Sequence, residues 1–101
     1  MKMYSSEICP GCKMFKALIA ERGIEDAFEI IDITEDVRKM REFLKLRDNE
    51  AAFAEVREHS FIGIPAFVND DGEITLEENV ALEWIGQPPM VKNFPGCATC
   101  K

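Results

Sequence analysis

The chain has 101 residues, of which 47% are hydrophobic and 31% charged, a balance typical of one compact domain with a single core. Its net charge of −7 offers nucleic acid or an anionic membrane little to bind. No apolar run approaches membrane-spanning length, and the first residues turn polar at once, so we expect neither a membrane segment nor an export signal. Four cysteines in such a chain favour a reducing compartment. We therefore expect a cytoplasmic protein, and a monomer.

The first predicted element is a strand over 2–5, which leads to a Cys-x-x-Cys pair at the start of a helix over 10–22. Cys9 suits the N-cap of this helix. Pro10 suits its first position, where a missing N–H and a fixed φ cost nothing. Cys12 lies one turn on, on the same face, and the N–H groups of the first turn favour a thiolate at Cys9. We expect Cys9 to attack a disulfide and the less exposed Cys12 to resolve the product by closing Cys9–Cys12.

The first helix is followed by a second strand. Gly23 is the expected stop of the helix, whose apolar face is predicted to hold Met14, Ala17 and Leu18. Residues 27–33 alternate apolar with acidic side chains and are rich in β-branched residues, which predicts a strand. A strand–helix–strand unit normally closes as a right-handed crossover, so we expect these two strands to be parallel.

Two further helices are predicted in the middle of the chain. Thr34 can cap the first of them. Its predicted apolar stripe consists of Val37, Met40 and Leu44. The Asp48-Asn49 pair interrupts this pattern and can cap a shorter helix over 49–58. His59 follows near its end, where a lone histidine is more often solvated or bound to a helix terminus than catalytic.

The last third of the chain predicts a hairpin, a helix and a tail. Residues 69–72, Asn-Asp-Asp-Gly, are a turn signal, and residues 64–76 are expected to form two antiparallel strands. Residues 77–85 predict a final helix, which completes the order β-α-β-α-α-β-β-α. Its apolar residues are Val80, Ala81, Trp84 and Ile85, and Gly86 is its stop. Proline and glycine then recur too often for a regular element. We divide the chain into a domain over 1–86 and a tail over 87–101 that carries Cys97 and Cys100.

These features resemble the glutaredoxins of the thioredoxin superfamily. A strand leads into Cys9-Pro10-Gly11-Cys12 at a helix N-terminus, and Ile64-Pro65 stands just before a β-hairpin. The resemblance covers residues 1–86 and implies an α/β, thioredoxin-like fold with a four-stranded mixed sheet flanked by helices. It also implies a thiol–disulfide oxidoreductase that acts on protein or low-molecular-weight disulfides. No cofactor would be bound, and glutathione or a thioredoxin reductase would supply the electrons.

The resemblance implies a set of substrate-binding residues: Pro10, Gly11, Ile64, Pro65, Thr75, Leu76 and Glu78. Pro65 would be a cis proline beside the redox pair, and the backbone of Ile64 would pair with an extended thiol substrate. The glycine pair with which glutaredoxins approach the glutathione backbone falls on Thr75-Leu76, so this surface is altered. Glu78 falls near the acidic position that holds the glutathione amine. Ser6-Glu7 replaces the basic residue often found before the first cysteine.

The two cysteine pairs leave other interpretations open. Cys9 and Cys12 together with Cys97 and Cys100 are a possible zinc or iron–sulfur site, since paired Cys-x-x-Cys units commonly bind metal. The whole domain separates the two pairs, and Pro10 suits a helix start better than a zinc knuckle, so we favour redox exchange without a metal. The tail can extend roughly 50 Å, so its cysteines form either a second redox pair acting on Cys9 or part of a passive tail. An arsenate reductase is disfavoured because no arginine closely follows the motif or immediately precedes Pro65.

Overall fold

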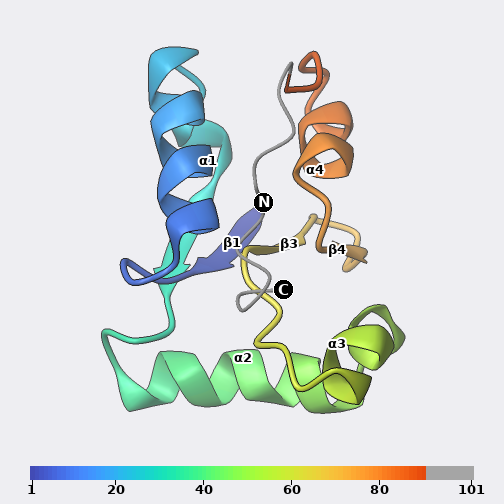
Figure 1. Cartoon of the computed structure of the whole chain (residues 1–101). Coiled ribbons are helices and arrows are strands. Elements are labelled where there is room, and N and C mark those ends of the chain that lie inside the picture. Colours follow the sequence, from blue (N-terminus) through green and yellow to red (C-terminus); the bar gives the residue numbers. More distant parts are fainter. Residues whose placement is uncertain (91–101) are drawn as a thin grey trace.

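The computed structural model describes residues 1–90 and shows a four-stranded sheet with helices on both faces (Figure 1). The strands are β1 (Lys2–Ser5), β2 (Glu29–Asp32), β3 (Ala66–Val68) and β4 (Ile74–Thr75). The α-helices are α1 (Pro10–Glu21), α2 (Val37–Asn49), α3 (Ala54–Glu58) and α4 (Glu78–Trp84), with 3-10 turns at Glu25–Ala27 and Ala51–Phe53. This succession confirms the predicted order of elements and the mixed α/β class.

The sheet has the order β2-β1-β3-β4, so β1 is a central strand. β1 pairs in parallel with β2, as the crossover through α1 predicts, and antiparallel with β3. β3 and β4 form the predicted hairpin, although both strands are shorter than expected. The side-chain oxygen of Asn69 builds the turn by accepting the N–H groups of Asp71 and Glu73 at 3.0 and 2.9 Å. Because β1 ends at Ser5, the chain passes from the centre of the sheet directly to the cysteine pair.

Successive residues of β1 and β3 point to opposite faces of the sheet, which creates two layers of core. One layer lies beneath α1 and α4 (Figure 1). Its buried members are Met3, Phe15, Ile19, Phe28, Phe67, Ala81 and Leu82. The ring of Phe15 lies edge-on to Phe28 and Phe67, with centroids 5.5 and 5.0 Å away. Such edge-to-face aromatic contacts are favourable and fix how α1 sits on the sheet.

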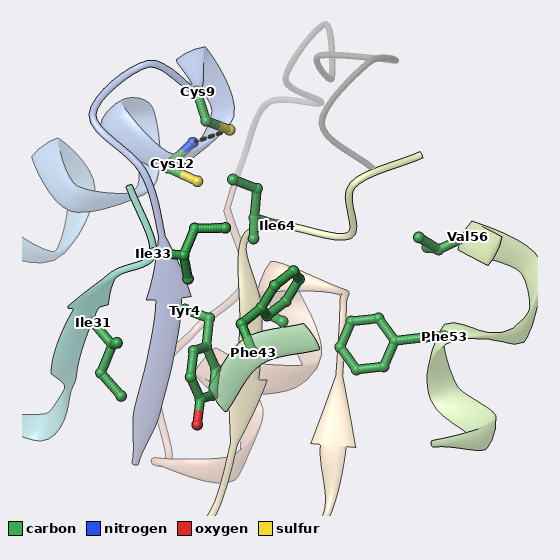
Figure 2. Close-up of a cluster of buried hydrophobic side chains, with 10 residues drawn as sticks. Tyr4, Cys9, Cys12, Ile31, Ile33, Phe43, Phe53, Val56 and Ile64 are labelled. Atoms are coloured by element: carbon green, nitrogen blue, oxygen red, sulfur yellow. Dashed lines mark hydrogen bonds between the residues drawn. The ribbon is translucent and has the colours of Figure 1, made fainter. Parts of the chain in front are cut away.

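The opposite layer lies between the sheet and the pair α2 and α3, and it includes both cysteines (Figure 2). Its buried members are Tyr4, Cys9, Cys12, Ile31, Ile33, Phe43, Phe53, Val56, Ile64 and Ala66. Phe43 of α2 is central, because its ring centroid lies 5.8 Å from those of both Tyr4 and Phe53. Burying such a ring stabilises the fold by about 1.5–3 kcal/mol. The cysteines are thus packed against the same core that holds α2.

The face that α1 buries differs from the predicted one. Met14 and Ala17 are exposed and Leu18 is half-buried, whereas the buried residues of the helix are Cys12, Phe15 and Ile19. The spacing of the apolar residues alone therefore predicts the wrong buried face of α1. The large ring of Phe15 decides the rotation of the helix, since it fills the space between two other aromatic rings. The helix ends at Glu21, one residue early, and Gly23 follows with the positive φ of 68° that suits the predicted stop.

The predicted apolar stripe of α2, Val37, Met40 and Leu44, is not the face that the helix buries. Val37 is 82% exposed, and Met40 and Leu44 are 38% and 40% exposed. The helix instead buries Phe43, with Leu46 partly buried beside it. Its apolar residues occupy more than one side, and the sequence pattern cannot decide which side faces the sheet. The side that carries Met40 and Leu44 therefore remains at the surface.

The capping residues of the middle helices need correction as well. Asp36 caps α2, because its side chain accepts the N–H of Arg38 at 2.7 Å, whereas Thr34 binds elsewhere. The Asp48-Asn49 pair does not start a helix: α2 continues to Asn49. A 3-10 turn then leads into α3, which has no side-chain cap. Hydroxyl, carboxylate and amide side chains are all good N-caps, so neighbouring residues such as Thr34 and Asp36 are both candidates. The fold decides which of them begins the helix.

The segment after α4 returns along the domain as far as residue 90. The guanidinium of Arg22 donates to the carbonyl of Pro88 at 2.7 Å, and Asn79 accepts the N–H of Met90 at 2.9 Å. Residues 91–101, which include Cys97 and Cys100, lie outside the described residues. The boundary between 86 and 87 stays a prediction. Every helix among residues 1–90 is too short or too polar to cross a membrane.

The ionisation of Tyr4 tests how the core on the α2 side of the sheet contributes to stability. Its hydroxyl donates to Glu42 at 2.7 Å, and burial together with this carboxylate raises the pKa of Tyr4 well above its usual range. The unfolded chain therefore ionises first, so this stabilisation is present below pH about 10 and is lost as the pH rises further. We expect Tyr4→Phe to lower the free energy of unfolding by about 1 kcal/mol at pH 7. We also expect it to remove the part of the fall in this free energy at alkaline pH that is due to Tyr4, which is up to about 1.4 kcal/mol per pH unit.

Urea unfolding of both proteins between pH 7 and 12 measures these differences. Tyr4 is the single tyrosine in the chain, so phenolate absorbance reports on it alone. A folded-state phenolate titration near pH 10 contradicts this account.

Candidate active site

Cys9 caps the N-terminus of α1, as predicted. Its backbone is extended (φ −100°, ψ 114°) and its Sγ accepts the N–H of Cys12 at 3.3 Å, while Pro10 begins the helix. The N–H of Cys9 donates to the carbonyl of Ser6 at 3.2 Å, which closes a turn before the helix. Cys9 and Cys12 are both buried, and no disulfide joins them. The sulfur of Cys9 is thus held where the N–H groups of a helix start are directed.

A chain of side-chain hydrogen bonds ties this loop to the end of β2. Thr34 donates through its hydroxyl to Asp32 at 2.6 Å, so the hydroxyl of Ser6, 2.9 Å away, donates to Thr34. Ser6 in turn accepts the N–H of Ile8 at 3.2 Å. The hydrogen bond from Thr34 is the main cause that lowers the pKa of Asp32. The loop before Cys9 is therefore held by a charged group on the neighbouring strand.

Ile64 belongs to the same buried cluster as the cysteine pair, on the α2 side of the sheet, and Pro65 follows it. The peptide bond between them is cis, in agreement with the expectation from the resemblance. Ile64 is buried, and Figure 2 shows it beside Cys12 and Ile33, above the ring of Phe43. Gly63 precedes it with a φ of 96°, and a Cβ there would lie 3.0 Å from the ring of Phe53. This position requires glycine, and so fixes the approach of the segment to the site.

A groove of about 770 Å³ opens beside Cys9. The start of α1, the end of β2, one side of α2 and the segment before Pro65 form its walls. Its lining residues are Ile8, Cys9, Pro10, Ile33, Thr34, Met40, Phe43, Leu44, Arg47, Ser60, Phe61, Ile62 and Ile64. Because most of these side chains are apolar, the groove offers a hydrophobic surface next to the sulfur.

Arg47 of α2 holds the far wall of this groove. Its Nε and Nη2 donate to the carbonyl of Phe61 at 3.2 and 2.6 Å, and Nε also donates to the carbonyl of Ile62 at 3.1 Å. A second arginine, Arg57, donates to the carbonyl of Arg47 at 2.7 Å. Charge-assisted hydrogen bonds of this kind are among the stronger ones in proteins. They position the segment before Pro65, whose sequence carries no regular pattern.

The structure brings together some of the site residues expected from the sequence and separates others. Cys9, Pro10 and Ile64 line the same groove. Thr75 and Leu76 line a second groove of about 400 Å³, which shares Phe61 alone with the first. Three further expected site residues have other positions: Gly11 follows Pro10 in α1, Pro65 is buried beside Ile64, and Glu78 is the half-buried first residue of α4. Their roles in substrate binding stay predictions.

His59 does not line the groove beside Cys9. His59 is exposed and stacks on Phe61 with ring centroids 5.5 Å apart. Within the described part of the chain, no three His, Cys, Asp or Glu side chains gather as metal ligands. The alternative four-cysteine site needs Cys97 and Cys100, which lie outside residues 1–90, so it stays a prediction.

Comparison with known proteins identifies the family to which the chain belongs. The glutaredoxin family model matches residues 1–52, which span the elements from β1 to the turn after α2 and include both site cysteines. The chain belongs to the glutaredoxin family. This membership agrees with the observed fold and supports a thioredoxin-like redox function. A Haemophilus influenzae protein described as uncharacterized is 25% identical over 75 residues, which are 74% of this chain and 85% of that protein. No solved structure matches the chain significantly.

Sequence reasoning missed several residues of the site of this glutaredoxin-family chain. The sequence pattern places Met40 and Leu44 in the apolar stripe of α2 and indicates no role for Ile8, Ile62 or Arg47. One signal was available: α2 carries Phe43 and Leu46 in addition to its predicted stripe, more apolar residues than a single buried face needs. The contact between Arg47 and the segment before Pro65 depends on the fold and leaves no local signal.

Thr34 tests whether the hydrogen-bonded chain holds the active-site loop. Thr34→Val keeps the side-chain shape but removes the hydroxyl, so we expect the pKa of Asp32 to return toward its ordinary value of 3.8 and stability to fall by at most about 1 kcal/mol. A carboxyl pKa that is lower in the folded than in the unfolded chain stabilises the fold at pH values above the unfolded pKa, and this contribution is lost as the pH falls. The difference in free energy of unfolding between wild type and Thr34→Val therefore shrinks toward pH 3. NMR titration of Asp32 and urea unfolding measure both effects.

Thr34→Ser, which retains the hydroxyl, is the matched control. Equal Asp32 titration in wild type and Thr34→Val contradicts the assignment.

Proposed function

We propose that this glutaredoxin-family chain is a thiol–disulfide oxidoreductase in which Cys9 attacks and Cys12 resolves. The observation that carries this proposal is the place of Cys9 at the N-cap of α1, with its Sγ accepting the N–H of Cys12 at 3.3 Å. A donor directed at sulfur stabilises the negative charge that the sulfur carries as a nucleophile or a leaving group. Both properties are needed for a site that passes disulfides on.

The reaction proceeds in two exchange steps. The Cys9 thiolate attacks one sulfur of a substrate disulfide, a Cys9–substrate disulfide forms, and the other substrate sulfur leaves and takes a proton from solvent. The Cys12 thiolate, formed by loss of its proton to solvent, then attacks Cys9 Sγ. This closes Cys9–Cys12 and releases the second substrate thiol. Two electrons pass from the protein to the substrate in total. A dithiol or two monothiols must then reduce Cys9–Cys12, for which glutathione or a thioredoxin reductase are the candidate donors.

The neighbourhood of Pro65 supports the same chemistry. Proline has no N–H, so Pro65 offers no backbone donor, and the apolar side chain of Ile64 shares a buried cluster with the two sulfurs. The backbone of Ile64 is the proposed pairing partner of an extended substrate. We place this activity in the cytoplasm and assign it to a monomer that acts on protein or low-molecular-weight disulfides without a bound cofactor.

Substitution of the two cysteines tests the assignment of roles. Cys9→Ser is expected to lower turnover of a small disulfide such as hydroxyethyl disulfide by at least about a hundred-fold, because no nucleophile remains at the helix start. Cys12→Ser is expected to accumulate a mixed disulfide at Cys9, detected as a mass increase of one substrate thiol. Assays with glutathione and with a thioredoxin reductase identify the electron donor.

The matched control is the pair Cys97→Ser and Cys100→Ser, which removes the tail thiols and leaves the proposed site intact. Turnover that is unchanged in Cys9→Ser overturns the proposal. Activity lost on chelation, with a stoichiometric metal in the purified protein, favours the four-cysteine metal site instead.

A further inference from the structure

The reactive sulfur of the proposed site is reached through the groove. Cys9 is 2% exposed, yet it lines the groove beside α2. The sulfur of Cys9 and the substrate sulfur that it attacks must come within roughly 3–3.5 Å of each other to react. A substrate therefore has to insert its disulfide into the groove, and the groove walls contact whatever flanks that disulfide. The walls, and not the sulfur alone, select the substrate.

Exposed apolar side chains concentrate at this groove. Among residues 1–90, four of the seven large hydrophobic side chains that are exposed line it, namely Ile8, Met40, Leu44 and Ile62. Their exposed fractions are 79%, 38%, 40% and 45%. A cluster of exposed apolar groups around a pocket marks a binding surface, whereas single ones are ordinary. Met40 also has a flexible side chain that adapts to different apolar partners.

The charges around the groove disfavour a highly charged ligand. Of the residues that line it, Arg47 alone is charged, and its guanidinium already donates to the carbonyls of Phe61 and Ile62 and to Asp48. Lys16, which follows the motif on α1, is paired with Glu7 at 2.9 Å. Glutathione has two carboxylates and an amine, each of which needs a charged or polar partner when it is bound. The residues at the glycine-pair positions, Thr75 and Leu76, line the other groove.

From these observations we infer that the groove binds a polypeptide that carries a bulky apolar side chain next to its disulfide-bonded cysteine. The inference rests on the proposed function and names its substrate class. Backbone pairing at Ile64 would lead an extended polypeptide past Cys9, and its apolar side chain would lie against Met40, Leu44 and Ile62. The volume of about 770 Å³ lies within the range of roughly 300–1,000 Å³ of ligand pockets.

The chemistry on such a substrate is the exchange already described. In the test substrate, the peptide cysteine is joined to thionitrobenzoate. The Cys9 thiolate attacks the peptide sulfur, a Cys9–peptide disulfide forms, and coloured thionitrobenzoate leaves as a thiolate. Cys12 then displaces the peptide thiol. The reduced protein supplies both electrons, so a single turnover needs no further reductant.

The experiment compares two peptides of equal length and charge in reaction with the reduced, full-length chain. Leucine and phenylalanine flank the cysteine in one, and serine and asparagine in the other. We expect the apolar peptide to react at least about ten-fold faster, since one well-filled apolar subsite discriminates by about this factor. Met40→Ser combined with Leu44→Ser is expected to lower the rate ratio to about two-fold. Because each ratio is taken within one variant, a general change at Cys9 cancels.

Met14→Ser is the matched control, since Met14 is also an exposed methionine on a helix, 40% exposed against 38% for Met40, but does not line the groove. It is expected to keep the wild-type ratio. Ile62→Ser is a second groove variant, outside the helices, that tests the same wall if the α2 variant fails to fold. Urea unfolding checks the stability of each variant.

Several outcomes would overturn the inference while the proposed function stands. These are equal rates with the two peptides, faster reaction of the thionitrobenzoate disulfide of glutathione than of the apolar peptide, and an unchanged ratio in both groove variants. In Cys12→Ser, the peptide trapped on Cys9 supports the inference, whereas a Cys9 disulfide to Cys97, to Cys100 or to a second copy assigns the groove to another occupant. No reaction with any disulfide removes the proposed function as well.

Discussion

The hydrogen bond from the N–H of Cys12 to the Sγ of Cys9 is the constraint on which the site depends. It requires that α1 begin at Pro10, because a helix that started earlier would turn the Cys9 side chain away from the first turn. Pro10 enforces this start by lacking an N–H, and the turn through Ser6 brings the chain there directly from β1. One local geometry therefore couples the strand, the helix and the sulfur.

The core and the site share residues, and this links stability with chemistry. Ile33, Phe43 and Ile64 belong to the buried cluster beneath the cysteines and also line the groove. A change in one of them would leave a cavity in the core and alter the groove at once. Met40 and Leu44 differ, because they are exposed on α2 and do not belong to the buried cluster that contains Phe43. Substitutions at these two surface positions are therefore expected to alter the groove at a lower cost in folding free energy than substitutions of Ile33, Phe43 or Ile64.

The local parts of the fold and site could be predicted from the sequence. The N-cap at Cys9, the hairpin turn over 69–72 and the order of elements each depend on short-range chemistry that neighbouring residues display. The rotation of α1 and α2 about their axes could not be predicted, since Phe15 and Phe43 contact Phe67 and Tyr4, which lie on distant strands. The groove was missed for the same reason: Arg47 and Phe61 meet only in the folded chain.

The sheet edges limit how this molecule associates with others. In the described part of the chain, β2 and β4 have unpaired outer edges, which could template intermolecular strands. β4 has only two residues, and in β2 the exposed Ile30 lies between the acidic residues Glu29 and Asp32, whose charge opposes a second strand. Edge-to-edge pairing with another chain is therefore disfavoured, and most of the large exposed apolar side chains of residues 1–90 remain concentrated at the groove beside Cys9, away from the strand edges.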